Sequence, residues 1–378
     1  MSALMISAIG MTTSLGIDSV DSCAAARAGL VRLTEIDTLN TANDIRFGRE
    51  DLDGIPMCVG HAAPVVASGR IGAAKLVALA APALLELLQR ARLTDEQLGR
   101  TGICLNVSDA YFQNRWGESP DTVNEFDSYP KFWRRAISDL PVRLSRAVRV
   151  SFSRRLQSTL AGGRVGLIDI LDQAASAIDA GTVDRCVVGC IESCLEPEAL
   201  QAYARAGILK TAANPTGFIP GEGAAFLLVE PAARNAAAGA ALGIVGAAAS
   251  QDAPYGESEA VCGNGIMAAI SNALVDRQPG TFPSVLVADL NGTETRASDW
   301  GYALLRMRAE MGDLEYEVWL PASSFGETGA AAGALGLCMV HRAFERRYLP
   351  GGKAIIVICS EDGRRGAIAV DGLDCYSN

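Results

Sequence analysis

The 378-residue sequence predicts an α/β protein, because strand-like and helix-like segments alternate along the chain. A strand, a glycine turn and a helix open the chain at residues 4–30, and strand–helix–strand segments return after an alanine-rich connector at 232–241. Hydrophobic residues make up 49% of the chain and charged residues 20%, which is typical of a compact, heavily buried protein and not of a disordered one. A chain of this length fits one large domain or two fused domains.

The hydrophobic pattern places the main elements in order. After the opening strand, a helix is expected over residues 20–28. An Ala/Leu-rich run at 73–92 predicts a long helix, and an apolar segment at 101–107 predicts the next strand. Residues 166–180 carry apolar side chains on one helical face, and a strand is expected at 185–189. These segments lie in the first half of the chain, which we delimit as 1–232, with 240–378 as the second half.

One segment does not fit the alternation. Residues 108–155 are aromatic and irregular, and we interpret them as an insertion or cap that could bury a partner surface. Packing over the protein's own core is the alternative. The segment ends in a basic run that could dock an acidic carrier protein or another partner, although a solvated helical face is the more usual explanation. The run consists of Arg143, Arg146, Arg149, Arg154 and Arg155.

Composition excludes several classes of partner. The net charge of −10 and the pI near 4.9 argue against nucleic acid or an anionic membrane as the main partner. No uninterrupted apolar stretch reaches the roughly twenty residues of a membrane span, and the N-terminus lacks the basic region of a signal peptide. Ten cysteines without a framework spacing fit free thiols in a reducing cytoplasm, which is the location we expect.

Cys186, Cys190 and Cys194 are spaced evenly by four, which invites a metal-binding interpretation. We favour structural thiols, because the spacing is not that of two close cysteine knuckles and no histidine is near. The chain has only two histidines, and His341 lies in a helical pattern that is typical of a helix-surface or core residue. We therefore expect no metal and no cofactor.

Four glycine-rich strings resemble the β-ketoacyl synthases of the thiolase superfamily. ISAIGMTTSLG at 6–16 is similar to their opening strand and loop, and GFIPGEGA at 217–224 is similar to one of their most specific signatures. NGTETRASD at 291–299 resembles the family's His-Gly-Thr segment, and SSFGETGAAAG at 323–333 resembles Gly-His-x-x-Gly-Ala-x-Gly. The resemblance implies a five-layer αβαβα fold made of two similar halves. It covers nearly the whole chain except 108–155.

The resemblance fails at the catalytic positions. Counting back from GTVD at 181–184, the family's acyl-accepting cysteine corresponds to Arg164, which cannot accept an acyl group. The family's two active-site histidines correspond to Asn291 and Glu327 in this chain. Neither of these side chains can replace a neutral imidazole. The family's lysine corresponds to Ala322, and its Gly-Phe-Gly-Gly gate becomes EDGR at 361–364. The condensation activity that the family performs is therefore expected to be absent, with no catalytic residue assigned.

In the family these positions converge, so Arg164 is expected to face Glu327. Opposite charges in a buried site need each other, because either one alone carries a heavy desolvation cost. The alternative is that helix and loop have shifted and both side chains reach solvent.

The resemblance implies two non-catalytic settings. One is a thiolase-like accessory or adaptor protein beside type VI secretion effectors, which we favour because the gate, the lysine and all three catalytic positions are lost together. The other is a chain-length-factor-like subunit that pairs with an active ketosynthase in polyketide- or fatty-acid-type synthesis. An acyltransferase with altered chemistry, using Glu327 or Asp362 as a base, is the enzymatic alternative. The expected partners are a second copy or a ketosynthase-like chain, paired through the strands near 101–107 and 185–189, and an effector or acyl-carrier protein.

Overall fold

The computed structural model describes residues 4–36, 58–109, 137–232, 241–255, 262–274 and 282–373. Ten of the described strands form one sheet in the order β10-β9-β11-β12-β8-β1-β7-β6-β4-β5, and β2 and β3 form a separate pair. The strands are β1 (Leu4–Thr12), β2 (Thr34–Ile36), β3 (Cys58–Gly60), β4 (Thr101–Val107), β5 (Gln157–Ala161), β6 (Arg185–Ser193), β7 (Glu222–Pro231), β8 (Ala241–Gln251), β9 (Val285–Val287), β10 (Glu317–Trp319), β11 (Lys353–Cys359) and β12 (Arg364–Leu373). The helices are α1 (Ser19–Arg27), α3 (Pro64–Ala67), α4 (Gly72–Ala91), α5 (Asp95–Gly99), α8 (Leu140–Val148), α9 (Gly166–Asp179), α10 (Pro197–Arg205), α11 (Asn264–Ala273), α12 (Glu294–Met311), α13 (Ala322–Phe325) and α14 (Ala332–Glu345), with 3₁₀ turns η3 (Gly329–Ala331) and η4 (Pro350–Gly352).

The large sheet consists of two groups of five strands with the same internal order. In each group the first strand in sequence lies beside the fifth, followed by the fourth, second and third: β1-β7-β6-β4-β5 and β8-β12-β11-β9-β10. In each group the second strand pairs in parallel with both its neighbours, and the fifth strand is antiparallel to both of its own. The groups join only through β1 and β8, from Leu4↔Ile244 to Ile6↔Leu242. This repetition confirms the predicted fold of two similar halves.

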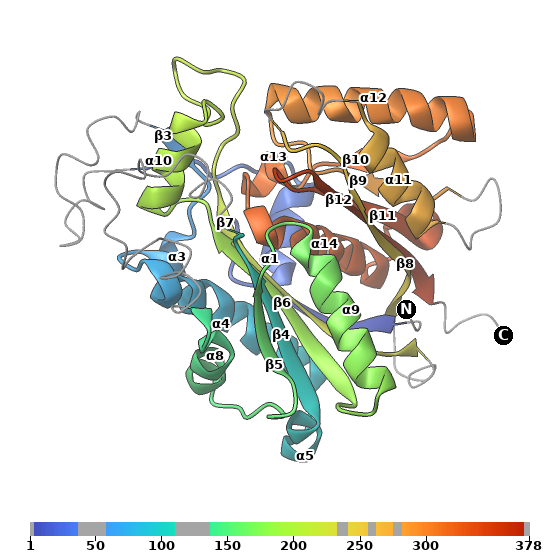
Figure 1. Ribbon diagram of the computed structural model, residues 1–378. Helices are drawn as coiled ribbons and strands as arrows, with labels where there is room; N and C mark the ends of the chain where they lie inside the picture. The colour runs from blue at the N-terminus through green and yellow to red at the C-terminus, as the bar shows by residue number, and fades with distance from the viewer. Residues whose placement is uncertain are drawn as a thin grey trace.

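The helices complete five layers (Figure 1). Helices α9 and α14 lie between the two groups of strands, where one apolar core joins residues from both halves. Helices α4 and α8 cover the outer face of the first group, and α11 and α12 cover the outer face of the second. Each helix turns its apolar side inward because the sheet faces it covers are themselves apolar. The sequence-based expectation of an αβαβα α/β protein is therefore confirmed.

Several predicted elements match closely. The helix expected at 73–92 is α4 and the strand at 101–107 is β4, while the strand expected at 185–189 extends to Ser193 as β6. By length and composition α4 alone among the described helices could cross a membrane. Its apolar side, however, packs against the first group of strands, as expected of a core helix.

The prediction that a second chain pairs through the strands near 101–107 and 185–189 is wrong. Strand β4 is hydrogen-bonded on both sides, to β5 and β6, and β6 is hydrogen-bonded on both sides, to β4 and β7. Neither has a free edge for a second chain. The edge of the first group is instead β5.

The structure bears on the remaining predictions only where it describes the residues concerned. Most of the expected insertion at 108–155 falls on 110–136, which lies outside the described residues, whereas α8 packs on α4. The proposed division of the chain at 232–240 falls between β7 and β8. The three evenly spaced cysteines are all buried: Cys186 and Cys190 lie in the central core, and Cys194 lies in a different apolar cluster.

Candidate functional site

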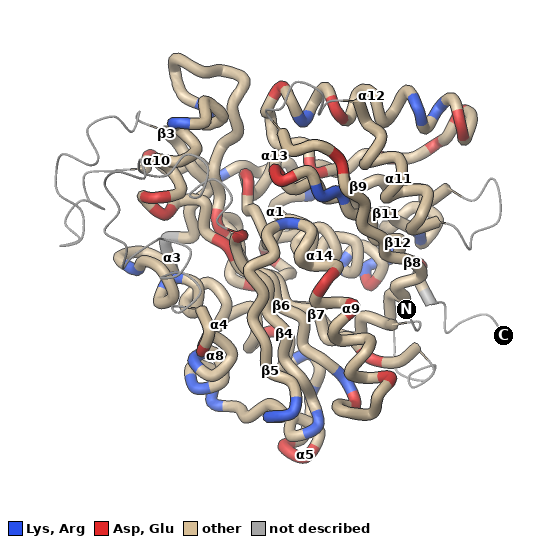
Figure 2. Tube along the Cα trace, viewed as in Figure 1, with Lys and Arg blue, Asp and Glu red and all other residues tan. Residues whose placement is uncertain are grey.

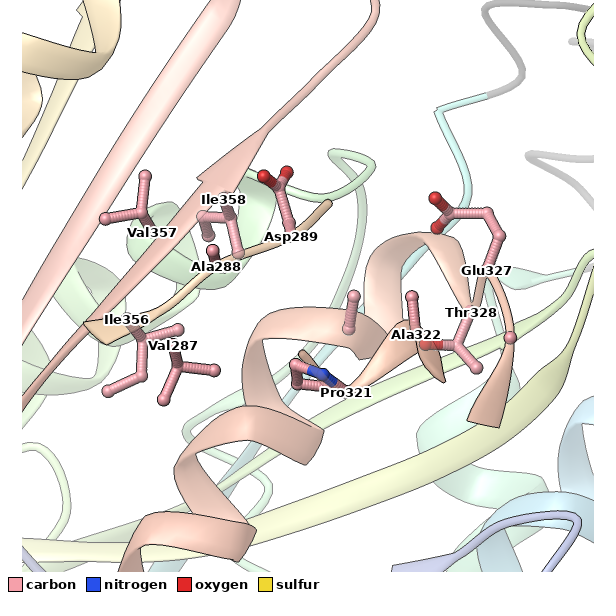
Figure 3. Close-up of a pocket in the computed structure, with 12 residues that line it drawn as sticks. Val287, Ala288, Asp289, Pro321, Ala322, Glu327, Thr328, Ile356, Val357 and Ile358 are labelled. Carbon is pink, nitrogen blue, oxygen red and sulfur yellow. The ribbon is translucent and has the colours of Figure 1, made fainter. Parts of the chain in front are cut away.

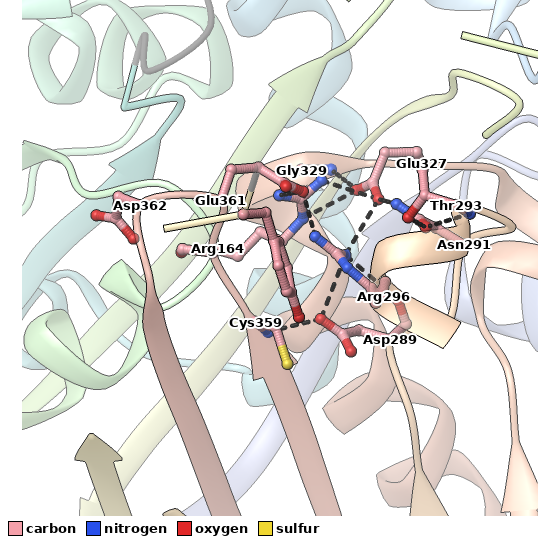
Figure 4. Close-up of polar contacts among 12 residues, drawn as sticks. Arg164, Asp289, Asn291, Thr293, Arg296, Glu327, Gly329, Cys359, Glu361 and Asp362 are labelled. Carbon is pink, nitrogen blue, oxygen red and sulfur yellow. Dashed lines mark hydrogen bonds and ion pairs between the residues drawn. The ribbon is translucent and has the colours of Figure 1, made fainter. Parts of the chain in front are cut away.

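The three positions where catalytic residues were expected converge between the two halves of the protein. Arg164 lies two residues before α9, Asn291 lies between β9 and α12, and Glu327 follows α13. All three belong to loops at the ends of buried elements, so the packing of those elements fixes where the side chains meet. Figure 4 shows them drawn together with neighbours from the β11–β12 turn.

Arg164 and Glu327 form the centre of this site. Nε of Arg164 donates to Oε1 of Glu327 at 3.2 Å, and Nη2 lies 2.9 Å from Oε2. This two-point geometry matches the planar guanidinium to the carboxylate. Arg164 is 7% exposed and Glu327 is 3% exposed, so the pair is shielded from water. The predicted pairing is confirmed, and the alternative in which both side chains reach solvent is wrong.

Two further residues extend the pair into a cluster. Glu361, in the β11–β12 turn, lies with Oε1 3.0 Å from Nη1 of Arg164, and the same oxygen accepts a hydrogen bond from Arg296. Arg296, on the first turn of α12, also places Nη1 3.6 Å from Oε2 of Glu327. Each arginine therefore contacts both glutamates. We call Arg164, Arg296, Glu327 and Glu361 the ionic cluster.

Two neutral groups also donate hydrogen bonds to the carboxylate oxygens of Glu327. Nδ2 of Asn291 donates to Oε2 at 2.6 Å, and the backbone N–H of Gly329 donates to Oε1 at 2.7 Å. The side-chain oxygen of Asn291 in turn accepts from the backbone N–H and the hydroxyl of Thr293. Asn291 is thus held as a hydrogen-bond donor to Glu327, which is the one property that it shares with a histidine at this position.

Asp289 supports Arg296 from the other side. Its Oδ2 lies 3.4 Å from Nη1 of Arg296 and accepts from the backbone N–H of Cys359, while Oδ1 accepts from Nε1 of Trp300. Arg296 is consequently fixed between three carboxylates and has little freedom to move.

Local backbone geometry places Arg164 and Glu327. Gly163 has φ +59°, and a Cβ there would meet Oδ2 of Asp109 at 2.4 Å. Gly326 has φ +72°, and a Cβ there would meet the ring of His61 at 2.6 Å. Only glycine fits both turns, because other residues would be strained as well as crowded. These two glycines, of which Gly326 belongs to the SSFGETGAAAG string, therefore shape the site.

The electrostatics of the cluster favour ion pairing over proton transfer. Burial raises the pKa of Glu327, but the opposing effect of Arg164 and then Arg296 is larger, and its pKa is lowered to about 2. Burial lowers the pKa of Arg164, but Glu327 and Glu361 raise it well above its ordinary value. A cation at the start of α9 also faces the positive end of the helix dipole, so its two carboxylate partners are needed. A carboxylate with so low a pKa is a poor general base near neutrality.

Little space remains around the cluster. A cavity of about 20 Å³, lined in part by Arg164, Glu192 and Glu361, has room for about one water molecule. A second cavity of about 20 Å³ lies beside Glu327, where aliphatic side chains of β9 and β11 face Pro321 and Ala322 (Figure 3). Neither volume can hold an acyl chain.

The nearby ionisable groups do not supply a nucleophile. Burial raises the pKa of the Cys359 and Cys194 thiols well above the ordinary value, so neither is a thiolate near neutrality. His341 is buried on α14, where desolvation lowers its pKa to about 4. Asp362 accepts from the backbone N–H of Arg364, and Figure 4 shows its carboxylate directed away from the cluster. Among the described residues, no group of three or more histidines, cysteines or carboxylates could hold a metal ion.

Sequence reasoning placed Arg164, Asn291 and Glu327 together but missed the roles of Arg296, Glu361 and Asp289. Arg296 lies in the NGTETRASD string at 291–299, and Glu361 was considered only as the first residue of EDGR at 361–364, which stands in place of the family's gate. A signal was present, since Arg296 lies in the first turn of a helix that follows a buried strand, and a buried arginine needs a counter-charge. The partners of that arginine come from other strands, so the string alone could not identify them.

The comparisons with known proteins agree with this architecture. Residues 166–235 match the profile of the β-ketoacyl synthase N-terminal domain. A Streptomyces coelicolor protein that bears the name actinorhodin polyketide β-ketoacyl synthase 2 is 29% identical over 139 residues. That alignment covers 34% of this chain and 32% of the relative, so the matched region spans about a third of the curated relative's length.

Solved structures extend the likeness over the whole chain. The ishigamide ketosynthase/chain length factor superposes with a TM-score of 0.73 at 18% identity, covering 98% of this chain and 99% of that one. A type II polyketide ketosynthase in complex with its acyl-carrier protein superposes with a TM-score of 0.73 at 17% identity, over 98% and 100% of the two chains. An oxazolomycin ketosynthase domain of Streptomyces albus JA3453 gives 0.72 at 16% identity, over 98% and 75%. At these identities the likeness establishes the fold.

Proposed function

For a chain with the thiolase-like ketosynthase fold, we propose a non-catalytic role as an accessory or adaptor protein that acts through its surface. The observation that carries the proposal is that Glu327 pairs with Arg164 and accepts from Asn291, at the three positions where the resemblance to the β-ketoacyl synthases places reactive groups. A guanidinium offers no acyl-accepting atom, and its carboxylate partner is held in the charged form. Among the described residues, the cavity beside Arg164 has a volume of about 20 Å³, which is too small for an acyl substrate.

The enzymatic alternative receives less support. A base needs a pKa near the working pH, and the arginines hold the pKa of Glu327 at about 2. Asp362, the other candidate base, points away from the cluster (Figure 4). In the described part of the chain, Cys194 and Cys359 are not activated thiols, since burial raises the pKa of both.

The proposed way of acting is pairing with a second thiolase-fold chain through β5. This strand ends the sheet, and its five residues contain no charge and no proline, the usual devices that protect a free edge. Leu160 is 37% exposed on it. The opposite end of the sheet, β10, is only three residues long and begins with Glu317, so it is better protected. A free, uncharged edge supports strand-to-strand pairing by a second copy or a ketosynthase-like chain.

A basic surface lies next to that edge. Helix α8 packs near β5, and all five arginines from Arg143 to Arg155 are exposed, as the blue segments around α8 in Figure 2 show. Arg143 pairs with Asp139 at 2.8 Å. On a chain of net charge −10, such a surface suits an acidic partner, for which an acyl-carrier protein or an effector are the candidates.

Two settings are compatible with this role. A chain-length-factor-like subunit is favoured by the likeness to the ishigamide ketosynthase/chain length factor. Effector loading in type VI secretion, in the cytoplasm, rests on the resemblance of a degenerate ketosynthase-like chain to accessory proteins of that kind. The common element of both is a partner-binding protein that forms no acyl-enzyme.

The test has two arms. In the first, the full chain is incubated with acyl-CoA and acyl-carrier thioesters and examined by intact-protein mass spectrometry; no acyl adduct and no turnover are expected. Turnover that is abolished by Glu327→Gln would establish an enzyme instead. In the second, affinity purification from the native host should recover either a ketosynthase or a secreted effector, and the partner's identity decides between the two settings.

A further inference from the structure

A groove of about 390 Å³ lies on the surface away from the ionic cluster, between α1 and β10. Its volume falls in the range of small-molecule sites, and it greatly exceeds the cavities beside Arg164 and Glu327. Residues of α1, β10, α13 and α14 line the groove, together with Tyr348, which lies three residues after the end of α14. Figure 1 shows α1, α13 and α14 grouped in this part of the molecule.

Aromatic and flexible apolar side chains line much of the groove. Trp319, Leu320, Met339 and Tyr348 are each half-buried, so part of every side chain remains accessible. Trp and Tyr present flat apolar faces, and Met adapts its shape to what it contacts. Such a surface suits a flat apolar body.

One cation faces this surface. The guanidinium of Arg27, on the last turn of α1, lies 3.9 Å from the centroid of the Tyr348 ring. Within the ranges that the structure describes, Arg27 forms no ion pair. A stacked guanidinium keeps its N–H edge free to donate to an oxyanion.

The one carboxylate in the lining is already engaged. Oε2 of Glu317 accepts from Nε1 of Trp319 at 3.1 Å, which fixes the indole against the wall. A negative charge in the lining disfavours a ligand with a second anionic group. The groove therefore favours a ligand with a single negative charge, placed near Arg27.

We propose that the groove between α1 and β10 is a binding site for a small amphipathic monoanion, whose flat apolar body packs on Trp319 and Tyr348 and whose carboxylate accepts from Arg27. The site is separate from the proposed pairing edge and does not depend on it. Ser323 and Ser324, in the lining, belong to α13, which leads directly to Glu327. The ligand would thus contact the helix that precedes Glu327, a member of the ionic cluster.

The experiment compares 2-naphthoate with its neutral isostere 2-naphthamide on the full chain, by calorimetry and by tryptophan fluorescence, with Trp319→Ala identifying the signal of Trp319 among the chain's four tryptophans. We expect 2-naphthoate to bind at one site, to quench Trp319, and to bind roughly tenfold more tightly than the amide, because a charge-assisted hydrogen bond contributes about that factor. Arg27→Gln should remove the preference and leave binding of the amide unchanged. Arg32→Gln, which changes an exposed arginine outside the lining, should leave both affinities unchanged.

Folding of the variants is checked independently, by requiring the same midpoint of urea unfolding as the parent chain. Trp319→Ala should weaken binding of both ligands, because it removes a wall of the groove. The proposal is overturned if 2-naphthoate does not saturate a site, or if Arg27→Gln leaves the preference for the anion intact.

Discussion

Nη2 of Arg164 lies 2.9 Å from Oε2 of Glu327, although the two residues are 163 positions apart in the chain. The pair joins the start of a central helix of the first half to a loop of the second half. Both side chains are buried, so each compensates the desolvation of the other. The contact is a buried ion pair between the two halves, and several consequences can be measured.

The first prediction concerns the stability that depends on this pair. Arg164→Met leaves Glu327 and Glu361 facing each other with one arginine fewer, and should lower the free energy of unfolding by about 3–5 kcal/mol. The double variant Arg164→Met/Glu327→Leu should recover much of that loss, because no unpaired charge remains at the centre. Urea denaturation measures both. Arg143→Met, which breaks an exposed pair with Asp139, is the control and should change little. Additive losses in the double variant would contradict the coupling.

The second prediction concerns acid. The pKa of Glu327 is lowered from 4.5 to about 2, so the folded state binds this proton less readily than the unfolded state. Its contribution, on the order of 3 kcal/mol, is present above about pH 4.5 and is lost as pH falls toward 2. Unfolding free energies measured at several pH values in this window should therefore fall less steeply for Glu327→Gln than for the parent chain. Parallel pH profiles would be inconsistent with a lowered pKa.

The third prediction is that the ionisation of Glu192 lowers stability as pH rises, which is the opposite of the effect of Glu327. Burial raises the pKa of Glu192 from 4.5 to about 7, and its Oε2 accepts from the backbone N–H of Ala330. Between pH 4.5 and 7 the unfolded carboxyl ionises while the folded one stays protonated, so stability decreases as pH rises through this window. Glu192→Gln keeps an acceptor oxygen and cannot ionise. Relative to the parent chain it should gain stability at pH 8 compared with pH 4, by an amount on the order of 3 kcal/mol. An equal effect at both pH values would contradict the prediction.

The fourth prediction concerns the sheet edges. A lysine at an exposed position of a pairing strand opposes strand association, so Leu160→Lys on β5 should lower the fraction of paired chains. Val318→Lys on β10, at the other end of the same sheet, is the matched control and should leave pairing unchanged. Light scattering over a range of protein concentrations measures the paired fraction. A parent chain that remains monomeric at every concentration would eliminate β5 as a pairing edge between copies.

Local patterns explain why the elements could be predicted. The apolar runs that give α4 and β4 are continuous in the sequence, so their boundaries were predicted within a residue. The pairing edge was misplaced because strand order is a long-range property: β5 is a short segment of mixed polarity, and nothing in β4 or β6 indicates that both their edges are occupied.

The sequence by itself determined the α/β class and showed that Arg164, Asn291 and Glu327 stand at the positions where the resemblance places reactive groups. The class follows from local periodicity, whereas the two similar halves were implied only by the resemblance and became evident in the strand order. Only the tertiary structure decided that Arg296 and Glu361 complete the ionic cluster and that little space remains beside it. The reason is physical: a buried charge is tolerated only with its counter-charges, and the counter-charges here come from turns that only folding brings into contact.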